Sequence, residues 1–284
     1  MSLSLTMNEP RSGALGTIVK AVLSGGVIAV VGMGLWGGLG LEAMKNPVFM
    51  PYVVPAMAAI LIIGALYLKY GKWPRTGAAF RNRAVRLNAV KLKPFLLSLA
   101  AGWSTMLTGF CLYVAHRMVG GMGGESALVF PHAPFAVLLP GLVMAGVVAG
   151  TVEEIGFRGF MQGTLERRFG VVPAILVSGF VWALFHTNHS YFAEDVALWF
   201  AMFLAISFML GGIAHRTDSL LPGIAVHSGF DITYFVFAGA LAPRIAPIAW
   251  VQSFATPTEL VVAAAGFGVV MLVSWIAFFK ATKA

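Results

Sequence analysis

The chain has 284 residues, of which 59% are apolar and 11% charged, with a mean hydropathy of +0.86 and a formal net charge of +8. A soluble domain of this size cannot enclose so many apolar side chains, so the composition excludes an ordinary soluble protein and predicts a bilayer protein. The single cysteine, Cys111, excludes an intramolecular disulfide and a thiolate metal cluster, and its apolar surroundings predict a packing role.

Apolar runs recur along the chain, most of them near the roughly 17 to 25 residues that a helix needs to cross hydrocarbon. They predict an all-α fold: a polytopic integral membrane helix bundle of about eight transmembrane helices, forming one membrane-embedded domain over residues 1–284. The first run is long enough to span and lacks the cleavage site of a secretory signal, so we expect a retained helix. The predicted spans are Ala14–Gly40, Val48–Leu68, Phe95–Ala115, Phe135–Val152 with a polar extension, Val171–His186, Val196–Ala214, Leu220–Phe237 and Leu260–Phe279.

The connection between the second and third runs carries eight basic residues and no acidic one. By the positive-inside rule it faces the cytoplasm, and alternating eight spans from it places both termini on the cytoplasmic side of the cytoplasmic membrane. A polybasic stretch beside a membrane helix also suits anionic lipid, and we expect no nucleic acid partner. The basic residues assigned to the inner side are Arg11, Lys69, Lys72, Arg75, Arg81, Arg83, Arg86, Lys91, Lys93, Arg167, Arg168, Arg216, Lys280 and Lys283, and those assigned to the outer side are Lys45, Arg117 and Arg244.

The fourth run continues into TVEEIGFRGF, and ionisable residues also interrupt later apolar runs. An ionised side chain at the centre of a membrane helix costs roughly 2.5 to 3.5 kcal/mol, so it persists where it faces a partner or a wet cavity. Such residues are candidates for a functional site. They are Glu153, Glu154, Arg158, His186, His227 and Asp231.

Spacing places two pairs of these candidates on common helix faces. Glu154 and Arg158 are four residues apart in the favourable order for an ion pair. His227 and Asp231 are also four apart, on an apolar helix that Pro222 can begin. Each pair can therefore point into one cavity.

A hairpin argument joins Glu153 to His186. If Phe135 to about Arg168 is one long helix and Val172–His186 the next, the turn lies near Gly170, 17 residues after Glu153 and 16 before His186. At about 1.5 Å per residue, both side chains then lie at one depth, roughly 25 Å from the turn and inside the bilayer.

Three short motifs therefore follow one another along residues 151–231: Glu-Glu-x-x-x-Arg ending at Arg158, Trp-x-x-x-His from Trp182 to His186, and His-x-x-x-Asp from His227 to Asp231. Together they resemble the signature of the CAAX protease family, the type II CAAX prenyl endopeptidases and their bacterial relatives, also called the ABI or CPBP family. The motif-bearing core is about residues 135–237. The resemblance implies an intramembrane endopeptidase whose cavity opens toward the cytosol.

The resemblance also implies roles for the residues of the first two motifs. Glu153 and His186 would hold and deprotonate a water molecule, without a metal or other cofactor. Glu154, supported by Arg158, would orient the site or pass a proton.

The third motif, His227 and Asp231, would stabilise the oxyanion in the same scheme. Family proteases that act on prenylated proteins commonly have Asn where this chain has Asp231. The implied partner is a peptide or protein substrate, prenylated or membrane-anchored in the family's namesakes. A bacterial member could instead trim a secreted peptide, act in bacteriocin self-immunity or process another membrane protein.

Two other interpretations of the same residues stay open. Two histidines and a glutamate are a sufficient ligand set for zinc, although the chain has no HExxH motif and the ligands come from separate helices. Alternatively, the polar cavity binds a peptide without cleaving it, in a scaffold, immunity protein or transporter. The absence of repeated halves in the sequence disfavours a transporter.

Overall fold

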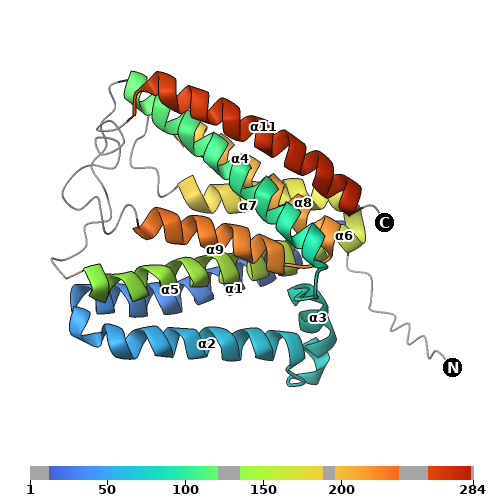
Figure 1. Ribbon diagram of the computed structural model, residues 1–284. Coiled ribbons are helices and arrows are strands. Elements are labelled where there is room, and N and C mark those ends of the chain that lie inside the picture. The colour runs from blue at the N-terminus through green and yellow to red at the C-terminus, as the bar shows by residue number, and fades with distance from the viewer. Residues whose placement is uncertain (1–12, 121–134, 188–195, 237–254, 283–284) are drawn as a thin grey trace.

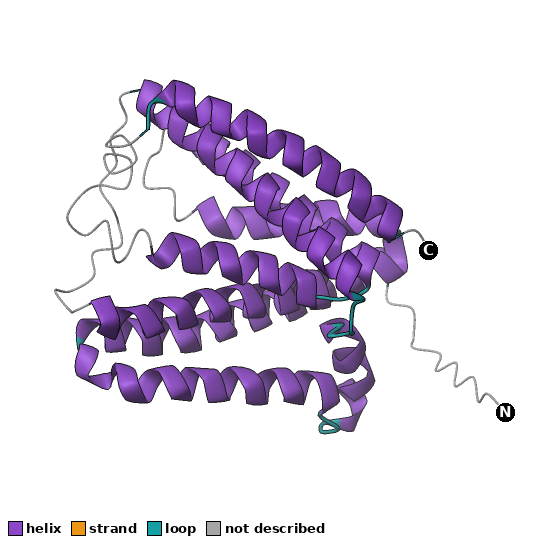
Figure 2. Ribbon diagram, in the orientation of Figure 1, coloured by secondary structure: helices purple, strands orange, loops and turns teal. Residues whose placement is uncertain are grey.

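The computed structural model describes residues 13–120, 135–187, 196–236 and 255–282, which form helices joined by short turns and contain no strand (Figures 1 and 2). The predicted all-α membrane bundle is thereby confirmed. The helices are α1 Ala14–Lys45, the 3-10 turn η1 Pro47–Phe49, α2 Met50–Tyr70, α3 Arg75–Val85, α4 Leu92–Val119, α5 Phe135–Glu153, η2 Glu154–Gln162, α6 Gly163–Phe169, α7 Val171–Thr187, α8 Val196–Thr217, α9 Leu221–Val236 and α11 Pro257–Ala281.

Each predicted apolar run forms a helix, although Phe237, the predicted end of one run, lies outside the described residues. Six helical stretches in the described ranges are long and apolar enough to cross a membrane. The other two, α7 and α9, have 17 and 16 residues. Large apolar side chains stay exposed along the outer helices, for example Val262 and Val269 on α11, as expected for surfaces in contact with lipid.

Local sequence signals set several helix ends. The Thr256 hydroxyl accepts from the Glu259 backbone N–H and the Glu259 carboxylate accepts from the Thr256 N–H, so a capping box begins α11. Pro222 is the second residue of α9, as predicted. Gly170, with φ of 83°, makes the turn between α6 and α7 at the predicted place, because glycine adopts positive φ without a steric penalty.

The helices pack as antiparallel partners: α4 against α11, α5 against α9, and α7 against α8, with α1 along α5 and η2 (Figure 1). Two glycines allow the close approach of α5 and α9. A Cβ added at Gly146 would lie 2.6 Å from the Ile232 backbone N, and one at Gly150 would lie 2.5 Å from the Ser228 backbone N. Small residues four apart let membrane helices approach to backbone contact, and here they fix the position of α9 beside the acidic motif.

The basic connection between α2 and α4 is itself partly helical, forming α3 at the end of the bundle where α6 ends and α9 begins (Figure 1). Arg167, Arg216 and Lys280 lie at the ends of their helices on this same side. Arg117 lies at the opposite end of α4. The predicted basic residues Arg11, Arg244 and Lys283 lie outside the described residues. Cys111 is buried, as its predicted packing role requires.

Candidate active site

The acidic motif lies where α5 changes into the π-helical segment η2, whose backbone bonds run from residue i to i+5. The predicted long helix from Phe135 to Arg168 is therefore continuous in its path, but its middle is not α-helical. The whole of η2 is buried, and its two glycines meet backbone: a Cβ added at Gly156 would lie 2.8 Å from the Gly25 O, and one at Gly159 would lie 2.6 Å from the Ala84 O. These contacts hold η2 against α1 and the end of α3.

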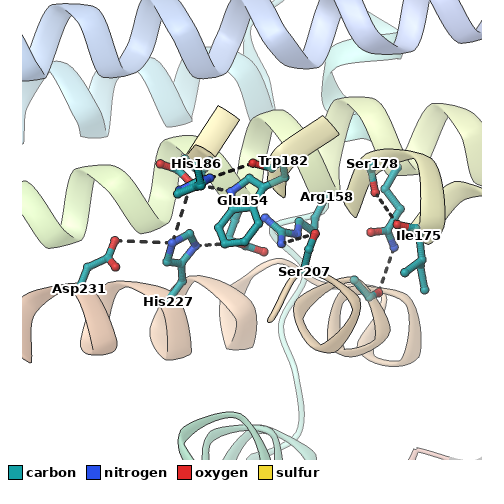
Figure 3. A network of polar contacts seen from close by, with 12 residues as sticks. Glu154, Arg158, Ile175, Ser178, Trp182, His186, Ser207, His227 and Asp231 are labelled. Carbon is teal, nitrogen blue, oxygen red and sulfur yellow. Dashed lines mark hydrogen bonds and ion pairs between the residues drawn. The ribbon is translucent and has the colours of Figure 1, made fainter. Parts of the chain in front are cut away.

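Glu154 and Arg158 form the fully buried side of the site. Arg158 Nη1 lies 3.0 Å from Glu154 Oε1, and both side chains have 0% exposure. Arg158 Nη2 donates to the Ser207 hydroxyl at 2.8 Å, so α8 supplies a second partner for the buried cation. His227 Nδ1 lies 3.0 Å from the same Glu154 oxygen, which joins α9 to the pair (Figure 3). The predicted ion pair therefore forms, and it is bound into a network of three helices.

Glu153 and His186 meet at one depth, as the hairpin argument predicts. His186 Nε2 lies 3.7 Å from Glu153 Oε2, longer than a direct hydrogen bond. The Trp182 indole N–H donates to the same Glu153 oxygen at 2.6 Å. His186 Nδ1 lies 2.8 Å from the Trp182 carbonyl oxygen, one turn earlier in α7. Because a carbonyl can only accept, Nδ1 carries the proton and Nε2 presents its lone pair toward Glu153.

His227 Nε2 faces the other two carboxylates of the cluster. It lies 3.5 Å from Asp231 Oδ2 and 3.9 Å from Glu153 Oε2 (Figure 3). The tautomer of His227 is therefore set by Glu154 at Nδ1, while Asp231 lies on the Nε2 side. The side chains of Glu153 and Asp231 are 12% and 20% exposed, so the cluster opens on this side and is closed on the Arg158 side.

Trp182 packs at the centre of these charges. The Arg158 guanidinium lies 4.8 Å from the indole ring centroid, and the ring centroids of His186 and His227 lie 4.1 and 5.8 Å from it. Trp182 is 1% exposed. The indole thus holds Glu153 by a hydrogen bond and covers the Arg158 guanidinium by a cation–π contact.

The structure brings all six predicted residues into one cluster. It also adds three contacts that sequence reasoning did not predict: the Glu153 bond to Trp182, the Arg158 bond to Ser207, and a donation from Arg86 Nη2 to the Arg158 carbonyl at 2.6 Å. Ser207 is one small residue in an apolar helix, and nothing in its sequence context distinguishes it. Within the described ranges, no three His, Cys, Asp or Glu side chains converge in a geometry that could hold a metal ion.

Residues 135–233, which contain the whole cluster, match a family model described as type II CAAX prenyl endopeptidase Rce1-like. The resemblance to the CAAX protease family is confirmed. This CAAX protease-like region comprises α5, η2 and α6 to α9, the helices at the centre of the packing.

The curated relatives that match the chain are distant. A CAAX prenyl protease 2 of Methanococcus maripaludis is 25% identical over 187 residues, which cover 62% of this chain and 66% of the relative. Lysostaphin resistance protein A is 22% identical in Staphylococcus epidermidis and 23% in Staphylococcus aureus, over 64% of this chain and 44% and 40% of those proteins. The match thus spans less than two thirds of each relative. No solved structure matches the chain.

Proposed function

We propose that the chain is an intramembrane endopeptidase that hydrolyses a peptide bond of a membrane-associated or lipidated protein or peptide with water activated by Glu153 and His186. The observation that carries the proposal is the pair of acceptors, Glu153 Oε2 and His186 Nε2, held 3.7 Å apart at the open side of the cluster. Polar groups at this separation can share one water molecule. The family match and the membrane bundle support the same reaction class.

The geometry suits a bound water as nucleophile. Its two hydrogens can point to Glu153 Oε2 and His186 Nε2, which leaves an oxygen lone pair for the substrate carbonyl. Glu153 takes the proton as general base and returns it to the leaving amine, a contribution of about 10² to 10⁴ in rate. The bond from Trp182 fixes the carboxylate, so the base is already oriented when substrate enters.

His227, held by the buried Glu154 and Arg158, would supply the positive charge that stabilises the transition state. Glu154 holds His227 in the tautomer with a proton on Nδ1, and Arg158 holds Glu154. When the ring carries both protons, Nε2 donates to the oxyanion of the tetrahedral intermediate. Glu154 Oε2 is buried without a hydrogen-bond partner in the described part of the chain, so the contacts of this carboxylate to Arg158 and His227 both run through Oε1.

The test compares cells that express the natural chain and Glu153→Gln at matched membrane levels, by the termini of their peptides and proteins. The Gln amide oxygen still accepts from Trp182, so we expect a folded protein in which Glu153-dependent termini fall at least about a hundredfold. Glu42→Gln, an exposed acid in α1, is the matched control and should leave the termini unchanged. Termini produced equally by Glu153→Gln would remove Glu153 from the base role.

The same comparison separates the two other interpretations. A biological effect that both proteins rescue, without any difference in termini, would identify a peptide-binding scaffold or immunity protein. A chelator should leave cleavage unchanged if Glu153 and His186 activate the water by themselves. Loss of cleavage on chelation, with stoichiometric zinc in the purified protein, would identify a zinc protease instead.

A further inference from the structure

A polar cavity of about 430 Å³, which none of the six residues of the acidic cluster lines, lies at the basic end of the bundle. Its walls come from the end of α3 and the segment that follows it, from α6, and from the turn between α8 and α9. Three arginines line it: Arg86, which is 9% exposed, and the exposed Arg83 and Arg167. The cavity thus has a buried guanidinium at its floor and two accessible ones nearer the solvent.

The acidic residues of the cavity are engaged by the protein itself. Glu166 Oε2 accepts from Arg86 Nη1 at 3.0 Å, and Glu166 Oε1 accepts from Gln162 Nε2 at 2.8 Å. Asp218 Oδ2 accepts from Asn88 Nδ2 at 3.2 Å. The two carboxylates therefore complete the walls, and the three guanidinium groups are the cationic part of the lining.

Arg86 has donor capacity beyond its own contacts. Its Nη1 and Nη2 each make one bond, to Glu166 and to the Arg158 carbonyl, and each of these nitrogens carries two hydrogens. Its Nε is buried without an acceptor among the described residues. A buried guanidinium with donors to spare is a site for an acceptor-rich anion.

The backbone of the cavity is held in an uncommon conformation. Among the described residues, the two with positive φ other than glycine are Arg86, at 39°, and Asp218, at 46°, and both line this cavity. Both residues directly follow the last residue of a helix, α3 or α8, where a left-handed residue commonly ends the helix. Cross-bonds maintain this conformation: the Leu220 N–H donates to the Arg86 O at 2.9 Å, and the Ser219 hydroxyl donates to the Asn88 O at 2.6 Å.

We propose that this cavity binds a phosphate group, through Arg86 at its floor and Arg83 and Arg167 above it. A guanidinium matches the spacing of two phosphate oxygens, and phosphate accepts from several donors at once. The cavity adjoins the connection that carries Lys69, Lys72 and Arg75 without an acid, which raises the local concentration of anions. The phosphate can come from an anionic lipid head group or from the aqueous phase. The site does not depend on the chain being a peptidase.

The test uses the full chain in nanodiscs. In one arm the lipid is neutral phosphatidylcholine and inorganic phosphate is titrated. In the other, phosphatidylglycerol is titrated into the lipid without added phosphate. Retained lipid is counted by native mass spectrometry, and unfolding temperature is followed in both arms.

The decisive variants remove two charges each. The double variant Arg83→Gln/Arg167→Gln changes the cavity, and Lys72→Gln/Arg75→Gln removes the same charge from exposed positions that do not line it. We expect the cavity variant to bind about tenfold more weakly and the control to lose much less affinity, because Lys72 and Arg75 attract the anion only at a distance. A response in the phosphatidylglycerol arm alone identifies a head-group site, and one to inorganic phosphate identifies a soluble ligand. Equal weakening in both variants, or no binding in either arm, would overturn the proposal.

Discussion

Glu153 is contacted from two helices besides its own, and each contact limits what the carboxylate can do. Trp182 and His186 approach from α7, and His227 approaches from α9, all toward Oε2. This convergence distinguishes Glu153 from its neighbour Glu154, which is fully buried and paired with Arg158. Two adjacent glutamates in the sequence therefore have different environments, one partly open and one closed.

Substitutions of Asp231 test whether His227 Nε2 stabilises the oxyanion. A carboxylate 3.5 Å from His227 Nε2 repels an oxyanion at that position, whereas an amide there donates a hydrogen bond. We expect Asp231→Asn to keep or increase the rate of cleavage and Asp231→Ala to lower it about tenfold. Rates on one substrate, once the termini comparison has provided it, measure both. An Asn variant as slow as the Ala variant would show that the charge of Asp231 is needed.

The sequence predicted the contacts that follow from helical spacing and from one hairpin. Glu154 with Arg158 and His227 with Asp231 are each one turn apart, and Glu153 meets His186 because the turn falls at Gly170. Spacing says nothing about how one helix is rotated against another. The bond that Arg158 donates to Ser207 on α8 and the bond that the Arg158 carbonyl accepts from Arg86 could therefore not be predicted from spacing.

At the scale of elements, the α5–α9 contact decides whether His227 can reach Glu154. A methyl group at Gly150 would overlap the backbone of Ser228, so α9 must shift outward. We expect Gly150→Ala to cost about 1 to 3 kcal/mol of stability and to reduce cleavage. Thermal unfolding and the cleavage assay measure the two effects. The control is Gly34→Ala on the exposed side of α1, where an added Cβ meets nothing within 4 Å.

The π-helical conformation of η2 could not be read from its sequence, because EIGFRGFMQ carries no signal that separates it from an α-helix. It depends on tertiary contacts, and Arg86 is one of them, since it donates to the Arg158 carbonyl and to Glu166. All eight apolar helices, in contrast, could be predicted from hydrophobic length alone. For residues 135–168, the predicted path of one long helix is confirmed, but the π-helical hydrogen bonding of η2 was not predicted.

Arg86 should therefore stabilise η2. We expect Arg86→Ala to lower stability by about 1 to 3 kcal/mol, because the Arg158 carbonyl and Glu166 Oε2 both lose the donor that Arg86 supplies. Arg86→Lys should recover only part of this, since one ammonium cannot reproduce the guanidinium fork. Hydrogen exchange of residues 154–162 measures the local effect. Arg75→Ala, on the exposed face of α3, is the control, and equal protection in Arg86→Ala and this control would contradict the role.

At the scale of the whole molecule, the basic residues indicate how the bundle is oriented in the membrane. We propose that α3 lies on the cytoplasmic side. The two ends can be labelled separately because Cys111 is buried and can be replaced by alanine. In that background, Arg75→Cys marks the α3 end and Thr258→Cys the start of α11 at the opposite end (Figure 1). We expect a membrane-impermeant maleimide to label Thr258→Cys in intact spheroplasts and Arg75→Cys only after permeabilisation. The reverse pattern would invert the topology.

The unequal lengths of the helices have a consequence for the bilayer. With 32 residues, α1 measures about 48 Å, whereas α7, with 17, measures about 25 Å, less than the roughly 30 Å of the hydrocarbon core. No single membrane thickness matches both described lengths, so we expect lipid beside α7 to thin and α1 to tilt. His186 stands at the end of the short helix. We therefore expect thinned lipid beside the candidate cluster, and we expect acyl chain length to affect how easily a membrane-bound peptide reaches Glu153.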